Sequence, residues 1–208
     1  MIPGRLVFKF LLDKIKLMNY NEVTVIDRFL ARTLLRFIPE SVTPNQVTGL
    51  RFVLTPVVFW LLYKEYYFWG FILFLFNMLT DAIDGAMART RNQITDLGKI
   101  IDPLADKLAI GSVAILLLFR FLNHWLAWAV VLLDVAIMLV GAFEKYILGR
   151  TIQAEIFGKL KLISQVIALA VLLIFVLTQI PFFLFLTKVV LWLAIILATI
   201  SLFRPHSI

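Results

Sequence analysis

The sequence has no cysteine and few charged residues. Of its 208 residues, only 16% are charged. Without cysteine the chain can form no disulfide bond and no thiolate metal site. Any metal site must therefore use hard oxygen ligands, which suit Mg²⁺ or Mn²⁺.

What the sequence has instead is apolar. Hydrophobic residues make up 62% of the chain, 19 residues are phenylalanine, and the mean hydropathy is +0.97. Soluble domains contain about half apolar residues. The composition therefore favours a bundle of membrane helices, whose lipid-facing surfaces and tight helix contacts accommodate many phenylalanines.

The apolar residues gather in long runs. A helix needs roughly 20 such residues to cross a bilayer, and the turn signal Thr43-Pro44-Asn45 opens the first run. We predict an all-α integral membrane protein with six transmembrane helices, at about residues 48–65, 68–88, 99–120, 124–147, 160–180 and 182–203.

The chain before the first run is apolar and basic. Residues 22–38 predict a helix with Arg28, Arg32 and Arg36 on one face and apolar residues on another. Such a helix is too polar to span and should lie in the membrane interface. We therefore divide the chain into an N-terminal extension, residues 1–42, and a six-helix membrane domain, residues 43–208. Charges interrupt the first apolar residues and no cleavage site follows, so we expect no cleavable signal peptide.

The net charge of +7 is distributed unevenly. Basic residues precede the first run, lie between the second and third and between the fourth and fifth, and follow the sixth. The positive-inside rule then places both termini and these connections in the cytoplasm of a multi-pass protein of the cell membrane. The charge is explained by anionic lipid headgroups, and no basic stretch with interleaved aromatics indicates nucleic acid.

Four aspartates lie where the second and third runs approach the cytoplasm. Asp81 and Asp84 end one run, and Asp102 and Asp106 begin the next. Spacings of three and four residues place each pair on one helix face, and a short connection makes the two helices antiparallel neighbours. Ionisable groups in a membrane are costly and are taken as functional by default. Four carboxylates together repel one another, so we predict that they bind divalent cations.

Small residues and an arginine accompany the aspartates. Gly85 and Gly98 flank the connection and would let a phosphate-bearing ligand approach the backbone, although glycine also serves helix packing. The planar fork of Arg89 suits phosphate oxygens. This combination indicates phosphoryl transfer assisted by metal ions.

These residues together resemble the signature of the CDP-alcohol phosphotransferase family. The pattern is Asp81-x2-Asp84-Gly85-x2-Ala88-Arg89-x8-Gly98-x3-Asp102-x3-Asp106. Six spans, an interfacial N-terminal helix and the element Pro44-Asn45-x2-Thr48 are also similar to that family.

The resemblance implies transfer of a phosphatidyl-type group from a CDP-linked lipid to an alcohol, with release of CMP. Two divalent ions, Mg²⁺ or Mn²⁺, would bind Asp81, Asp84, Asp102 and Asp106, and Asp106 would also act as the catalytic general base. The residues implied for CDP-lipid binding are Asn45, Thr48, Gly85, Ala88, Arg89 and Gly98. Arg51 is a further candidate for this pocket, and Asn45 fits a helix cap equally well. The resemblance also implies a homodimer.

The acceptor is indicated less directly. The segment Asp102-Pro-Leu-Ala-Asp106-Lys107 and Gly158-Lys159-Leu-Lys161 are similar to the phosphatidylglycerophosphate synthase branch of the family. A phosphorylated acceptor, glycerol-3-phosphate, would then bind Arg150, Lys159 and Lys161, whose charge the positive-inside rule explains equally well. One feature differs from that branch, which carries an Arg-Glu pair late in the fourth span: here Phe143 precedes Glu144 and Lys145 follows it. Asp134, in the middle of the same span, has no assigned role other than pairing with another helix. Inositol phosphate, and phosphatidylglycerol as in a cardiolipin synthase, therefore stay open.

Two other functions use similar residues. A membrane prenyltransferase also binds pyrophosphate through Mg²⁺, but it needs a second acidic motif, whereas beyond Asp106 only isolated Asp134, Glu144 and Glu155 occur. A divalent-cation transporter needs polar residues near the other membrane face, and the outer halves of the runs are almost uniformly apolar.

Overall fold

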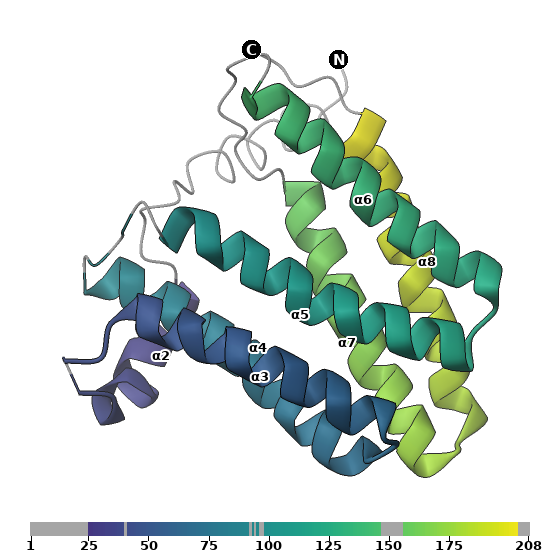
Figure 1. The fold of residues 1–208 in the computed structure, drawn as a ribbon, viewed down its shortest axis with the longest axis horizontal. Coiled ribbons are helices and arrows are strands. Elements are labelled where there is room, and N and C mark those ends of the chain that lie inside the picture. The colour runs from purple at the N-terminus through teal and green to yellow at the C-terminus, as the bar shows by residue number, and fades with distance from the viewer. Residues whose placement is uncertain are drawn as a thin grey trace, which may run out of the picture. The chain divides into compact units, whose positions relative to one another are not determined.

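A computed structural model describes residues 25–39, 41–91, 93, 95, 98–146 and 156–203. Within these ranges the chain is helical, with one 3-10 turn and no strand, which confirms the all-α prediction. The elements are α2 (Val25–Thr33), η1 (Leu35–Phe37), α3 (Pro44–Tyr63), α4 (Tyr67–Thr90), α5 (Gly98–Phe121), α6 (His124–Tyr146), α7 (Ile156–Thr178) and α8 (Pro181–Phe203) (Figure 1).

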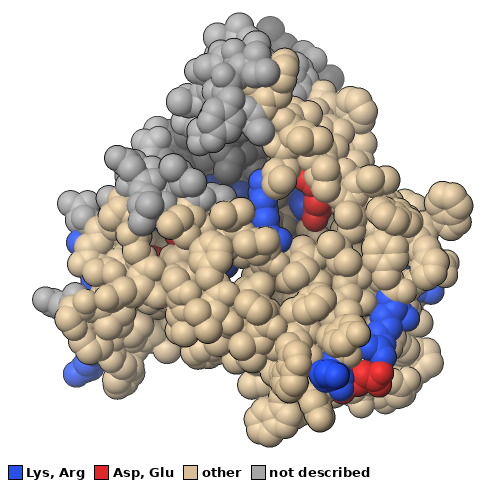
Figure 2. Space-filling view, in the orientation of Figure 1, with Lys and Arg blue, Asp and Glu red and all other residues tan. Residues whose placement is uncertain are grey.

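Five of these helices are long and apolar enough to cross a membrane: α3, α4, α6, α7 and α8. With 24 residues, α5 is also long enough, but it carries Asp102, Asp106, Lys107 and Arg120, which keep it out of this set. The span predicted at residues 99–120 therefore remains a prediction. Charged side chains are sparse on the molecular face drawn in Figure 2, as expected for helices that contact lipid.

Near the N-terminus of the described chain, the helix predicted to reach residue 38 ends earlier. It ends at Thr33, whose hydroxyl donates a hydrogen bond to the carbonyl of Phe29 at 2.8 Å. Such bonding within a helix competes with the regular pattern, and the chain continues as the 3-10 turn η1. Placement of this helix in the membrane interface stays a prediction.

The chain divides into two compact units. Unit 1 comprises the described residues of Met1–Leu50 and Leu79–Pro103, and unit 2 those of Arg51–Met78 and Leu104–Ile208. Thus α3, α4 and α5 contribute residues to both. The boundary predicted between residues 42 and 43 stays a prediction.

Unit 2 contains the larger apolar core. In this unit α8 packs along α7 and also contacts α6 (Figure 1). The largest side chains of the core are fully buried and come from several helices, and between membrane helices such side chains stabilise the fold through close van der Waals packing. They are Val58, Leu62, Phe74, Leu117, Leu118, Leu169, Leu172, Leu173 and Leu191.

A tight turn joins α3 to α4. Glu65 has φ of 66°, the amide of Tyr66 donates to the carbonyl of Leu61 at 2.9 Å and that of Glu65 donates to Leu62 at 3.2 Å. This is the Schellman pattern that ends a helix with a left-handed residue. Past the turn, Gly70 packs on the side chain of Leu62, where a Cβ would collide, so the two helices approach closely.

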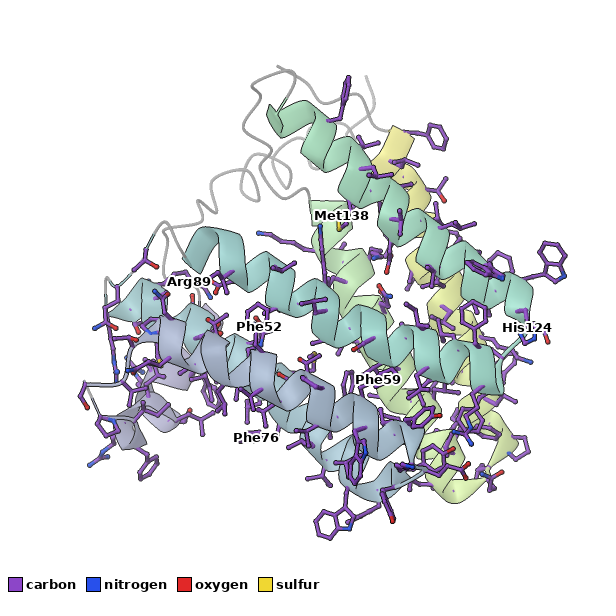
Figure 3. The ribbon with its side chains drawn as sticks, viewed as in Figure 1. Phe52, Phe59, Phe76, Arg89, His124 and Met138 are labelled. Carbon is purple, nitrogen blue, oxygen red and sulfur yellow. The ribbon has the colours of Figure 1, made fainter. Side chains whose placement is uncertain are left out.

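Aromatic side chains gather at this end of unit 2. Trp60, Trp69 and Trp125 are all exposed, and the ring of Tyr67 at the start of α4 meets that of Phe121 at the end of α5, with centroids 5.7 Å apart. Exposed tryptophan and tyrosine concentrate at membrane–water interfaces. The cluster is therefore typical of the position where helices leave the bilayer. His124 begins α6 at this end. Away from it, in the middle of α4, Phe76 is also exposed (Figure 3).

Candidate active site

The last turns of α4 carry the first half of the predicted site. Asp84 is buried, with 3% of its surface exposed, and Asp81, one turn earlier, is half-buried. Ala88 is also half-buried, and its carbonyl accepts a hydrogen bond from the amide of Gln93 at 3.0 Å. The helix continues through this acidic stretch to Thr90, so its polar residues keep the regular spacing of one face.

Thr48 on α3 brings two of the predicted metal ligands together. Its Oγ1 lies 3.0 Å from Oδ2 of Asp84 and 2.9 Å from Oδ1 of Asp102, and 3.2 Å from the carbonyl of Pro44. A hydroxyl has one proton, so it can donate to one of these acceptors at a time. Within unit 1, carboxylates from α4 and α5 therefore converge on a single, fully buried hydroxyl.

The donor atoms at this point fit a hard divalent cation. Carboxylate and hydroxyl oxygens are what Mg²⁺ and Mn²⁺ prefer, and a cation between Asp84 and Asp102 would relieve the repulsion between them. In the described part of the chain, however, no three acidic or histidine side chains approach closely enough to form a metal cage. The predicted four-aspartate metal site therefore stays a prediction.

Asp106, the predicted general base, belongs to unit 2 and pairs with Arg51. The guanidinium of Arg51 donates from Nη2 to Oδ1 of Asp106. Arg51 is completely buried, whereas the Asp106 side chain is 24% exposed. An ion pair of this kind holds the carboxylate in one rotamer while leaving it accessible. The sequence predicted a nucleotide contact for Arg51 and did not predict this pairing.

Asn45 and Gly98 meet through Thr95. The hydroxyl of Thr95 donates to Oδ1 of Asn45 at 3.1 Å and accepts the amide proton of Gly98 at 3.0 Å. A Cβ at Gly98 would lie 3.1 Å from both oxygen atoms and 3.6 Å from Oδ2 of Asp102. A side chain at position 98 would therefore press on these polar groups where the start of α5 passes them.

The structure also identifies the cap of α3. The amide of Thr43 donates to Oε1 of Gln46 at 2.9 Å, and the amide of Gln46 approaches Oγ1 of Thr43 at 3.4 Å. This reciprocal arrangement is a capping box. Because Thr43 caps the helix, the side chain of Asn45 is directed to Thr95 instead, which favours its assignment to the pocket.

Arg89 forms a contact that the sequence did not predict. Its Nε and Nη2 donate to the two oxygen atoms of Asp27 on α2, at 2.8 and 2.7 Å. Figure 3 shows Arg89 at the end of α4. One signal was present, because Asp27 is an acid three residues before the buried Leu30 on a helix otherwise rich in arginine.

The predicted acceptor residues have different surroundings. Lys161 on α7 forms an ion pair with Asp134 on α6, which also accepts a hydrogen bond from Nε2 of Gln165 at 2.9 Å. Asp134 therefore does pair with another helix. Lys159 is exposed, and Arg150 lies outside the described residues, as do the side chains of Glu144 and Lys145.

A small cavity adjoins the Lys161–Asp134 pair within unit 2. Polar and apolar residues of α6, α7 and α8 line it: Val130, Leu133, Asp134, Lys161, Gln165, Ala194, Ile195 and Ala198. Lys161 therefore lines this cavity with Asp134 as its carboxylate partner, and its charge is balanced before any ligand binds.

Comparison with known proteins supplies a family. The sequence profile of a family described as CDP-alcohol phosphatidyltransferase matches residues 41–200, which is most of the chain and includes Thr48, Arg89 and the four predicted metal-binding aspartates.

Individual relatives agree. The chain is 29% identical over 184 residues to a CDP-diacylglycerol–glycerol-3-phosphate 3-phosphatidyltransferase of Bacillus subtilis, covering 76% of this chain and 90% of the relative. It is 32% identical over 139 residues to an enzyme of the same name from Pseudomonas fluorescens, covering 62% and 71%. It is also similar to a probable CMP-forming cardiolipin synthase of Drosophila melanogaster, with 36% identity over 106 residues, or 50% of this chain and 33% of the relative.

Proposed function

Because the chain belongs to the CDP-alcohol phosphatidyltransferase family, we propose that it transfers a phosphatidyl group from CDP-diacylglycerol to glycerol-3-phosphate and releases CMP. The names of the Bacillus and Pseudomonas relatives support this donor and acceptor. The observation that carries the proposal is the convergence of Asp84 and Asp102 on Thr48, because these are signature aspartates from two different helices.

The reaction is a displacement at phosphorus. The acceptor hydroxyl oxygen forms a bond to the β-phosphorus of the donor while the bond from that phosphorus to the oxygen bridging it to CMP breaks. CMP leaves with the electron pair of the broken bond, and the hydroxyl proton moves to the Asp106 carboxylate. A base must lie within hydrogen-bond reach of the proton that it takes, and Arg51 fixes the rotamer of Asp106 for this purpose.

Two divalent ions held by Asp81, Asp84, Asp102 and Asp106 would offset the negative charge that develops on the phosphate oxygens. Thr48 contributes by holding the carboxylates of Asp84 and Asp102 at a common point. The oxygen-only donor set is consistent with Mg²⁺ or Mn²⁺.

The donor's nucleotide and pyrophosphate contact the residues predicted for CDP-lipid binding: Asn45, Thr48, Gly85, Ala88, Arg89 and Gly98. Arg89 offers a guanidinium suited to two phosphate oxygens. The side chain of Asn45 in α3 lies beside Gly98 at the start of α5, which brings two of these residues together.

Basic residues at and before the start of α7 receive the phosphate of the acceptor: Arg150, Lys159 and Lys161. Lys159 is exposed and Lys161 is paired with Asp134, so the two lysines differ in how readily they meet a new anion. We expect Lys159→Ala to raise the KM for glycerol-3-phosphate much more than the KM for the lipid.

Phosphatidylglycerol is the second candidate acceptor, supported by the similarity to the Drosophila protein named a probable cardiolipin synthase. The chemistry is unchanged, and a lipid headgroup replaces the soluble alcohol. Lys159→Ala would then leave acceptor kinetics nearly unchanged, because phosphatidylglycerol carries no terminal phosphate monoester.

The enzyme belongs to a multi-pass membrane protein family of lipid metabolism. We assign both termini and the active site to the cytoplasmic face, on the distribution of lysine and arginine. We further propose six membrane spans, with α5 among them, and a homodimer as the assembly.

The test is CMP release by purified protein in mixed micelles containing CDP-diacylglycerol and Mn²⁺ or Mg²⁺. Glycerol-3-phosphate, inositol phosphate and phosphatidylglycerol are supplied separately, and EDTA serves as the metal-free control. We expect CMP with glycerol-3-phosphate and none with EDTA. No CMP release with any acceptor would overturn the proposed function, and divalent-ion flux in vesicles under the same conditions would favour a transporter.

A further inference from the structure

Asp27 is an acidic residue in the first turn of α2. Only 2% of its surface is exposed, and its two carboxylate oxygens accept from Nε and Nη2 of Arg89 at 2.8 and 2.7 Å. Parallel hydrogen bonds between a guanidinium and a carboxylate fix the orientation of both groups. A residue outside the signature therefore determines how a signature arginine points.

Gly85 makes room for this arrangement. It precedes Arg89 by one turn of α4, and a Cβ at Gly85 would lie 3.1 Å from Nη2 and 3.4 Å from Nη1 of Arg89. The guanidinium of Arg89 thus lies back over the helix surface at the glycine. Gly85 was predicted to admit a phosphate to the backbone, and within unit 1 it also provides the surface on which the guanidinium rests.

The segment after α2 is held by a different arginine. Arg91 donates to carbonyl groups at the start of η1 and beyond its end, with the shortest contact 2.7 Å to Ile38 and others at 3.2–3.4 Å to Leu35, Pro39 and Val42. The segment after α2 is therefore held by Arg91, whereas the orientation of Arg89 depends on Asp27. This separation provides a matched control.

We propose that Asp27 is a positioning residue for the donor nucleotide: it holds the Arg89 guanidinium over Gly85 in the orientation that receives a phosphate of the CDP group. The inference rests on the proposed function, which assigns Arg89 to that group. The Arg89 side chain is 25% exposed, so it is both oriented and accessible. A long side chain that is already ordered loses less rotamer freedom when the ligand binds.

The experiment measures binding of CDP to the full-length, detergent-purified protein in the presence of Mn²⁺, by calorimetry. We expect Asp27→Asn to weaken CDP binding roughly 10-fold, the scale on which outer partners of a ligand-binding group act. Asp27→Glu should recover most of the affinity, because it restores the carboxylate. Arg91→Gln, the control, should lower thermal stability and leave CDP affinity within about twofold.

A double variant tests whether Asp27 acts through Arg89. If it does, Asp27→Asn combined with Arg89→Gln should bind CDP no more weakly than Arg89→Gln alone, because coupled residues are not additive. An unchanged affinity in Asp27→Asn, an equal loss in Arg91→Gln, or fully additive losses in the double variant would each overturn the inference.

CMP release measured on the same preparations separates this inference from the proposed function. If the wild type releases CMP and the Asp27→Asn variant binds CDP with unchanged affinity, only the positioning role of Asp27 is overturned. If CDP affinity changes as expected but the wild type releases no CMP, the transfer reaction is overturned, whereas the nucleotide site and the positioning role of Asp27 are retained. A wild type that binds no CDP overturns both.

Discussion

Two groups of polar residues within the helices differ in how their carboxylates are paired. In unit 2, Asp134 forms an ion pair with Lys161 and accepts a hydrogen bond from Gln165. In unit 1, Asp84 and Asp102 come from different helices and converge on the hydroxyl of Thr48. The first arrangement matches one negative charge with one positive charge of the same chain. The second brings two carboxylates to one neutral hydroxyl.

The difference separates the structural role of the Asp134 carboxylate from the chemical role proposed for those of Asp84 and Asp102. An ion pair between two helices satisfies its members and ties the helices together, although its net contribution to stability is small when desolvation is included. Two carboxylates at one hydroxyl repel each other, which costs stability. Such an arrangement inside a membrane helix therefore indicates a functional role. A single buried aspartate in a membrane helix is therefore weaker evidence for a site than two that share a partner.

The largest effect is expected from Asp84→Asn, which removes a charge from the convergent pair. Loss of several kcal/mol of metal-assisted stabilisation corresponds to a decrease in CMP release on the order of 1,000-fold. Asp134→Asn is the matched control and should retain activity within about tenfold. Equal losses in the two variants would erase the distinction between the two groups.

Asp106→Asn should come next, with a loss of turnover of roughly 100- to 10,000-fold, the range for removal of a general base. The amide keeps the shape of the side chain and a hydrogen-bonding oxygen for Arg51. Binding of the CDP-lipid should therefore remain measurable by equilibrium dialysis against labelled donor. A variant with normal turnover would show that Asp106 is not the base.

Thr48→Val tests the shared hydroxyl. The variant keeps the shape of the side chain and removes the group on which Asp84 and Asp102 converge, so we expect Mn²⁺ affinity to fall about 10- to 100-fold. Electron paramagnetic resonance of free Mn²⁺ in a titration measures this directly. Thr48→Ser should restore affinity, and failure of this rescue would assign the loss to packing.

Asp134→Leu should destabilise the fold and spare the chemistry. Removing one member of a fully buried ion pair costs about 3–5 kcal/mol, and because the Asp134 side chain is 29% exposed we expect about 2 kcal/mol, below that range. Thermal unfolding in detergent measures it. The double variant Asp134→Leu with Lys161→Met should recover much of the loss, because it leaves no uncompensated charge.

Glu65→Gln should have the smallest effect. Glu65 pairs with Arg120, but its side chain is 60% exposed, and exposed pairs contribute at most about 1 kcal/mol. We expect unchanged CMP release and a melting temperature within a few degrees of the wild type. A large loss of activity would show that the turn between α3 and α4 communicates with the chemistry.

Hydropathy and spacing predicted the long helices well. Each of the six predicted runs corresponds to one helix among the described residues, α3 to α8, with ends displaced by a few residues. The largest shifts are at the starts of α3, which begins at Pro44 rather than residue 48, and α7, which begins at Ile156 rather than residue 160. At α7 the reason is that Lys159 and Lys161 are compatible with a helix although they are not apolar.

Pairing between distant residues could not be predicted in the same way. Arg89 contacts Asp27 across 62 residues and Arg51 contacts Asp106 across 55. Helical spacing identifies the face on which a residue lies, but it does not identify the neighbouring helix or the rotamer. For this reason Arg51 was assigned to the nucleotide, and Asp27 received no role.

The charges of α5 also bear on how the protein reaches its final state. A charged residue at the centre of a helix adds roughly 2.5–3.5 kcal/mol to the free energy of transfer into lipid through the translocon, and every 18-residue stretch of α5 contains at least three charged residues. This segment should therefore enter the bilayer poorly by itself. To span the membrane as proposed, it needs a more apolar segment of the same chain as a companion during synthesis, which ties biogenesis of the protein to the residues of the proposed chemistry.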